Sequence, residues 1–241
     1  MHCFLRLALL LAVGPLCLLS ACSSDEPQPE PQEYNGIYVT VNGERLSGWM
    51  NVDVFHVPKG LRVMVEEDFS VHAMKYICIE GDIMMRDRTL EDPRTDAPNL
   101  RLACEEEILI TGRIIGGAGR SFAGVPPENC VGQPGGDGSS IELSSPRYLV
   151  LGALVAGRGG RGGAGSNGGQ GGTIEVIGDL VNPDQHIFIK ESRIKQLASA
   201  DAGFYGGAGG GAGPEWQGVP GSPGQSGGMS SQSWSRPATA E

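Results

Sequence analysis

A short pattern recurs along this chain at intervals of 33 to 41 residues. The apolar-polar-apolar triplet Ile141-Glu142-Leu143 returns 33 residues later as Ile174-Glu175-Val176, and related triplets begin at Leu61 and Leu100. A second pattern follows them, with two or three β-forming residues, a glycine and another apolar residue. It occupies Ile77–Ile83, Ile108–Ile114, Tyr148–Leu154 and, more loosely, Glu175–Leu180. Periods of this length are typical of solenoids, in which a unit too small to bury its own apolar face stacks on its neighbours.

The units consist of short β-forming runs separated by turns, without the 3.6-residue period of a helix, which indicates parallel β-structure. From Leu61 to Gly213 the pattern resembles right-handed parallel β-helix proteins, specifically predicted bacterial surface lipoproteins whose coils carry I-x-A/G-x-Gly-Gly loops. The resemblance implies an all-β fold: a short right-handed parallel β-helix, or solenoid, with Gly-rich loops.

The Gly-rich segments 116–138, 157–172 and 203–228 occupy one place in the repeat, after the strand that contains the bend glycine. Residues 157–162 fit the dinucleotide-binding pattern GxGxxG, but no helix-forming segment follows to bind a phosphate. Gly218, Gly221, Gly224 and Gly227 have a collagen-like spacing. Because four triplets are too few for a triple helix, we expect a flexible tail there.

The N-terminus resembles a bacterial lipoprotein signal peptide. Arg6 supplies the positive charge, Leu7–Leu19 is apolar, and Leu19-Ser20-Ala21-Cys22 matches the lipobox. The resemblance implies that Cys22 becomes the first mature residue and carries the acyl chains, including palmitate, that anchor the protein to a bilayer. An ordinary secretory signal or a short membrane anchor is the alternative. Ser23 is not the aspartate typical of inner-membrane retention, which favours the outer membrane.

These patterns predict four parts of the chain. Residues 1–21 are the signal peptide, and 22–36 are the lipidated cysteine with an acidic, Pro-rich tether that has too few apolar residues to form a core. Residues 37–202 are a capped β-helix domain, and 203–241 are a Gly/Ser/Pro-rich flexible tail. The formal net charge of −10 at pH 7 argues against nucleic acid and anionic lipid headgroups as partners.

Three cysteines follow Cys22 at equal spacing: Cys78, Cys104 and Cys130. In an oxidising cell envelope an odd number predicts one disulfide and one thiol, and we favour Cys104 with Cys130, which would close one Gly-rich excursion. Three separate thiols are the alternative. The CxxC spacing typical of zinc thiolate sites is absent from the sequence.

Acidic residues form two runs at the same short interval after a repeat triplet. If the repeats stack about 4.8 Å apart, their carboxylates face one another at one corner and offer a Ca²⁺ site. The six residues are Glu66, Glu67, Asp68, Glu105, Glu106 and Glu107. A solvated turn is the alternative. We interpret His56, His72 and His186 as half-buried strand residues rather than ligands.

The sequence lacks a nucleophile elbow, an HExxH helix and a P-loop, so we expect a non-enzymatic protein without a cofactor, Ca²⁺ excepted. The expected role is that of a lipid-anchored outer-membrane surface lipoprotein, structural or adhesive, that contacts an envelope protein or polysaccharide. The alternative is a β-helix polysaccharide lyase or hydrolase. That reading requires a basic residue facing a carboxylate in a groove, and Arg113, Arg147 and Lys190 are the basic residues nearest the strands.

Overall fold

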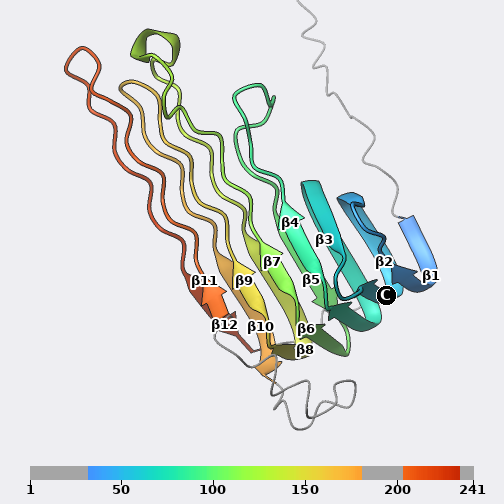
Figure 1. Ribbon diagram of the computed structural model, residues 1–241. Coiled ribbons are helices and arrows are strands. Elements are labelled where there is room, and N and C mark those ends of the chain that lie inside the picture. The colour runs from blue at the N-terminus through green and yellow to red at the C-terminus, as the bar shows by residue number, and fades with distance from the viewer. Residues whose placement is uncertain (1–31, 181–202, 234–241) are drawn as a thin grey trace, which may run out of the picture. The chain divides into compact units, whose positions relative to one another are not determined.

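A computed structural model describes residues 32–180 and 203–233, and this part of the chain is all-β, as predicted (Figure 1). Its one helical element is a 3-10 turn, η1 (Pro127–Asn129). The strands are β1 (Gln32–Val39), β2 (Arg45–Val57), β3 (Arg62–Ile79), β4 (Asp82–Met85), β5 (Leu100–Cys104), β6 (Glu107–Ile110), β7 (Arg113–Ile115), β8 (Ile141–Val150), β9 (Ala153–Val155), β10 (Ile174–Leu180), β11 (Gly203–Tyr205) and β12 (Met229–Gln232). They join in a 12-stranded sheet in which all pairings between these strands are parallel.

The strands form three parallel ladders, which the chain enters in the same order each time. The first ladder joins the start of β3 to β4, β7, β9 and β11. The second joins the middle of β3 to β5 and the first halves of β8 and β10, and ends at β12. The third joins the end of β3 to β6 and the second half of β8. Because β3 and β8 each span more than one ladder, the path β3-β5-β8-β6 closes on itself.

The predicted register is correct for most of the repeats. Leu100 pairs with Ile141, and Ile141 pairs with Ile174, as the triplets predict. In the second pattern, Ile77, Ile108 and Tyr148 are aligned, and so are Ile83, Ile114 and Leu154.

The prediction is wrong for the triplet that begins at Leu61 and for the loosely matched Glu175–Leu180. The start of β3 belongs to the first ladder, whereas Leu100 pairs with Phe69 in the second. Glu175 pairs with Glu142, also in the second ladder. The first error arises because the 18-residue β3 passes through all three ladders without a break, so one strand contains what the sequence pattern treated as two elements.

Alternating residues of the ladders point inward and form the core. Phe69, Val71 and Ala73 of β3 are all at most 3% exposed, whereas the intervening Ser70 and His72 are only half-buried. Burial of such rows, at about 25 cal/mol per Å² of apolar surface, is the main stabilising contribution.

A glycine marks the bend from the third ladder to the first. A Cβ on Gly112 would lie 1.8 Å from the Gly81 oxygen, and one on Gly152 would lie 1.6 Å from the Gly112 oxygen. Successive bends therefore stack too closely for any side chain, which explains the glycine in the three aligned copies of the second sequence pattern.

The Gly-rich excursions all lie between the first ladder and the second, as predicted, and they are ordered. Residues 116–140, 156–173 and 206–228 each run out from the strands and return, and they lie side by side (Figure 1). A relay of N–H···O=C bonds of 2.8–2.9 Å crosses all three excursions. From donor to acceptor it passes through Gly224, Gly210, Gly169, Gly160, Gly136 and Arg120.

The excursions form hydrogen bonds with a period of three residues, as the stretch from Gly135 to Ile141 illustrates. Its N–H groups bond in turn to the adjacent excursion, to a facing segment and to a side chain of the segment between β4 and β5. Asp137 N–H, for example, donates to Asp96 Oδ1 at 2.8 Å. Every N–H of this stretch has a partner, so the segments satisfy their backbone as a sheet does. We call the three excursions the glycine array.

The predicted flexible tail is wrong over residues 203–233. Gly203–Tyr205 forms β11 on β9, and Met229–Gln232 forms β12 on β10. A Cβ on Gly210 or Gly224 would lie 1.9 Å from an oxygen of another excursion. At Gly221, Gly224 and Gly227 the collagen-like spacing places glycine at the crowded third position, as in collagen, but here the neighbouring segments belong to the same chain.

Candidate functional site

The six acidic residues do not gather at one corner, so the predicted Ca²⁺ site lacks its geometry. Asp68 accepts the Asn99 N–H at 2.7 Å at the start of β5, whereas Glu105 follows the end of β5. Six residues of extended chain separate Asn99 from Glu105, a distance of roughly 20 Å. The cause is the register error in β3, which placed residues 66–68 level with 105–107.

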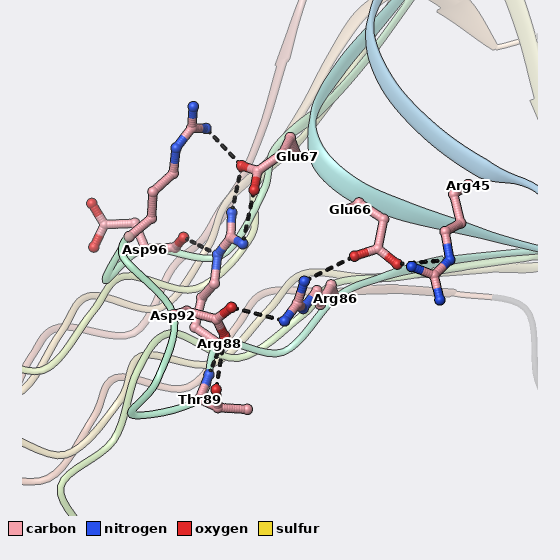
Figure 2. Close-up of polar contacts among 9 residues, drawn as sticks. Arg45, Glu66, Glu67, Arg86, Arg88, Thr89, Asp92 and Asp96 are labelled. Atoms are coloured by element: carbon pink, nitrogen blue, oxygen red, sulfur yellow. Dashed lines mark hydrogen bonds and ion pairs between the residues drawn. The ribbon is translucent and has the colours of Figure 1, made fainter.

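The first acidic run instead binds arginines (Figure 2). The Arg88 side chain is 2% exposed and contacts Glu67 through both terminal nitrogens, at 3.3 and 2.8 Å. Its Nε donates to the Asp96 carbonyl at 2.8 Å. Arg94 adds a second ion pair to Glu67 at 2.7 Å. The hydrogen bonds from Arg88 hold the pKa of the Glu67 carboxyl below its usual value.

Arg86 continues this network. It joins Glu66 at 3.0 Å to Asp92 at 2.8 Å, and Asp92 accepts hydrogen bonds from the backbone and side chain of Thr89. The bond from the Thr89 N–H, together with the nearby arginines, holds the pKa of the Asp92 carboxyl below its usual value. Because these charges compensate one another, the network ties the segment between β4 and β5 to the acidic residues of β3.

The structure does not contain the predicted disulfide between Cys104 and Cys130, and neither residue is bonded to another cysteine there. Cys104 ends β5 and packs in the core, where burial raises the pKa of its thiol. Cys130 follows η1 within the first excursion, and its Sγ lies 3.5 Å from the Pro126 oxygen. The ordered excursion carries Cys130 away from the strands, so the expected covalent closure of the excursion is replaced by hydrogen bonds.

A hollow of about 460 Å³ lies on the outer face of the second ladder. Two polar rows cross the strands there, Asp68-Asn99-Ser140-Thr173 and Ser70-Arg101-Glu142-Glu175. A smaller hollow of about 250 Å³ continues from Ser70 and Arg101 to His72, Glu105 and Ser144. We call the two together the polar groove.

Charged side chains of the polar groove pair with one another. Arg101 pairs with Glu142 at 2.9 Å, and His72 lies 3.6 Å from Glu105. Ser140 Oγ accepts the Thr173 N–H at 3.0 Å, so the first row also stabilises the backbone. The resulting surface presents hydroxyl, amide and carboxylate groups at the strand spacing, about 4.8 Å.

A third hollow, of about 680 Å³, shares Glu105 with the polar groove and contains one of the basic residues named for the enzymatic alternative. Arg147 Nη2 lies 3.1 Å from Glu107 Oε1, and Lys75, Tyr76, Glu105 and Glu106 complete much of the lining. Burial raises the pKa of the Tyr76 hydroxyl, which keeps it neutral. Arg113 pairs with Asp82 at 2.6 Å outside this hollow. Lys190 lies outside the described residues.

The structure also joins three residues that sequence reasoning kept apart: His56, Cys78 and Glu80. One candidate ligand atom from each lies within 4.8 Å of the other two. His56 was interpreted as a strand residue, and Cys78 was considered for disulfide formation. The signal in the sequence is an interval of 22 residues from His56 to Cys78, which equals the interval between the aligned core residues Phe55 and Ile77.

Cys22 lies outside the described residues. Among the residues that are described, no helix has the length and apolar character needed to cross a membrane. No protein-family model matches the chain, and no curated protein or solved structure is significantly similar to it.

Proposed function

We propose that this chain is an outer-membrane surface lipoprotein, anchored through acylated Cys22, whose folded part is a right-handed parallel β-helix with a structural or adhesive role. Three ladders entered in a fixed order support the β-helix assignment. The lipobox Leu19-Ser20-Ala21-Cys22 supports the anchor.

The polar groove carries the functional part of this proposal. Its two rows place a polar side chain on each successive strand across β3, β5, β8 and β10, and this regular spacing of hydrogen-bonding groups suits an extended polymer with regularly spaced hydroxyl groups. Asp68, Glu142 and Glu175 outnumber Arg101 in the larger hollow, and the whole chain is acidic. Like charges disfavour a polyanion, so the partner is a neutral polysaccharide of the envelope or of a contacted surface.

Affinity electrophoresis against neutral and anionic polysaccharides tests the groove. Ser70 lies in both hollows of the groove, so Ser70→Trp should obstruct it and weaken binding at least tenfold. Met74→Trp, on an exposed position of the same strand outside the groove lining, is the matched control and should bind as the unmodified protein does. Absence of binding to every neutral polysaccharide, or equal loss in both variants, would contradict the proposal.

Metabolic labelling with a fatty acid tests the anchor. Label should enter the unmodified protein and not Cys22→Ala, and the mature mass should begin at residue 22. An unlabelled protein that needs no detergent for extraction would refute the anchor while leaving the groove proposal untouched.

The second candidate is a polysaccharide lyase or hydrolase, and the Arg147–Glu107 pair in its hollow is the observation in its favour. Release of new reducing ends from a polysaccharide, with unsaturated sugars for a lyase and without them for a hydrolase, would favour this enzyme over the binding protein if it is lost in Arg147→Ala and retained in Ser70→Trp.

A further inference from the structure

The cluster of His56, Cys78 and Glu80 lies on the outer face of the third ladder. His56 in β2 and Cys78 in β3 are direct partners in the parallel ladder. Glu80 follows Cys78 by two residues and therefore projects from the same face. The His56 Nε2 and Glu80 Oε2 atoms are 3.2 Å apart.

We propose that His56, Cys78 and Glu80 form a binding site for one Zn²⁺ ion. Imidazole nitrogen, thiolate sulfur and carboxylate oxygen are the three ligand types that zinc accepts, at roughly 2.0–2.3 Å. The mixed set favours zinc over Ca²⁺ and Mg²⁺, which select oxygen ligands. Three protein ligands leave the fourth tetrahedral position for water or an exogenous ligand.

The backbone holds the three residues in place before any metal arrives. The Glu80 N–H donates to the Val57 carbonyl at 2.8 Å, which ties Glu80 to the residue after His56. Gly81 then turns the chain where a Cβ would lie 2.5 Å from the Leu61 and Pro58 oxygens. Two ligands on paired strands and a third at a tight bend need little reordering to bind, which favours affinity.

The surroundings give the site one apolar side and one open side. Cys78 packs against a cluster formed by Leu109, Leu149 and Leu151. The His56 and Glu80 side chains remain 29% and 21% exposed, so an ion can enter from solvent. An apolar wall strengthens the attraction between the metal and its charged ligands.

The competing explanation for the short distance between His56 and Glu80 is a simple ion pair, and a second His–Glu pair in the molecule serves as a reference. His72 and Glu105 form such a pair at 3.6 Å on the second ladder. Within the described residues, a thiol joins a histidine and a carboxylate in a compact metal-ligating group at His56–Cys78–Glu80 and not at His72–Glu105. Comparing zinc binding by variants of the two His–Glu pairs therefore distinguishes zinc coordination from ordinary ion pairing.

Titration of the full-length, detergent-solubilised and metal-free protein with Zn²⁺ under reducing conditions tests the site. Calorimetry should give one zinc per chain, and affinity should fall as the pH is lowered because protons compete for the ligands. Co²⁺ should produce the near-ultraviolet absorption of a cobalt–thiolate bond. Cys78→Ser, His56→Gln and Glu80→Gln should each weaken zinc binding by more than about 100-fold, since even residues beyond the direct ligands are worth 10–100-fold.

The matched controls are Cys130→Ser, His72→Gln and Glu105→Gln, which should bind zinc as the unmodified protein does. Absence of stoichiometric binding, or equal weakening in these controls, would overturn the proposal. A measurement on the unmodified protein covers the case in which a variant does not fold. Zn²⁺, but not Ca²⁺, should slow the alkylation of Cys78 at least tenfold and leave the alkylation rate of Cys130 unchanged. Equal alkylation rates of Cys78 with and without zinc would refute the site.

Discussion

Gly160→Ala tests whether the glycine array is a packed structure. A Cβ at this position would lie 1.9 Å from the Arg120 oxygen and 2.5 Å from its carbonyl carbon. These are backbone atoms, so a rotamer change cannot relieve the clash. An ordinary contact begins near 3.4 Å, and the two segments must therefore separate by about 1.5 Å.

That separation breaks hydrogen bonds at the centre of the array. Gly160 donates to Gly136 and accepts from Gly169, and Gly136 donates to Arg120, all at 2.8–2.9 Å. Three bonds at roughly 0.5–1.5 kcal/mol each give a loss of about 1.5–4.5 kcal/mol. The reduced entropy of the unfolded chain returns about 0.4–1 kcal/mol, so the net destabilisation is about 0.5–4 kcal/mol.

Gly211→Ala is the matched control in the same array. The nearest atom to its added Cβ is Arg161 Cγ at 3.8 Å, an ordinary contact. Only the effect on the unfolded chain then remains, and it stabilises by about 0.4–1 kcal/mol.

Urea unfolding followed by circular dichroism, with hydrogen exchange at the array amides, measures both variants. We expect a lower midpoint and faster exchange for Gly160→Ala, and neither for Gly211→Ala. If the excursions were flexible loops, both substitutions would be neutral or slightly stabilising, and that result would refute the packed array.

Three other predictions concern the core and the arginine network. Ile110→Ala, at a side chain with 0% exposure, should destabilise the protein by about 2–5 kcal/mol in the same urea assay. Thr173→Ala, at an exposed side chain, should change stability by less than about 1 kcal/mol. Equal effects would show that the wrong residues of the strands have been assigned to the core. Arg88→Met should cost about 1–3 kcal/mol through its lost hydrogen bonds, and an unchanged midpoint would contradict a stabilising network. The pKa values of Glu67 and Asp92 are held below their ordinary values of 4.5 and 3.8, so the unfolded chain takes up protons first as the pH falls. The contribution of the two carboxylates to folding stability is therefore full above about pH 5 and is lost on acidification. Glu67→Gln should flatten the fall in melting temperature below pH 5, and an unaltered profile would refute the assignment.

The sequence was sufficient to predict the local features of the fold. Alternation in segments such as Leu100-Arg101-Leu102 predicts strands with one buried face, and the bend glycines predict the passage from the third ladder to the first. The location of the Gly-rich excursions also follows from the repeat. These features depend on neighbouring residues and are visible in a single strand and its turn.

Which side chains meet in a cluster depends on the register between successive repeats of the chain, and these repeats differ in length. The interval between aligned core residues is 22 from Phe55 to Ile77 but 31 from Ile77 to Ile108. A count from one triplet therefore misplaced the acidic residues, and the pairing of His56 with Cys78 was missed.

The sequence by itself determined an all-β chain whose repeats pair in parallel and whose glycines cluster at one point of each repeat. Only the tertiary structure decided that the glycine array is ordered and that the candidate zinc ligands meet. A three-residue glycine period suits both a flexible chain and a close-packed one. The outcome depends on whether partners such as Gly136 and Gly169 lie beside Gly160 to satisfy its backbone. That proximity is a property of the assembled ladders, which bring together segments distant in the chain.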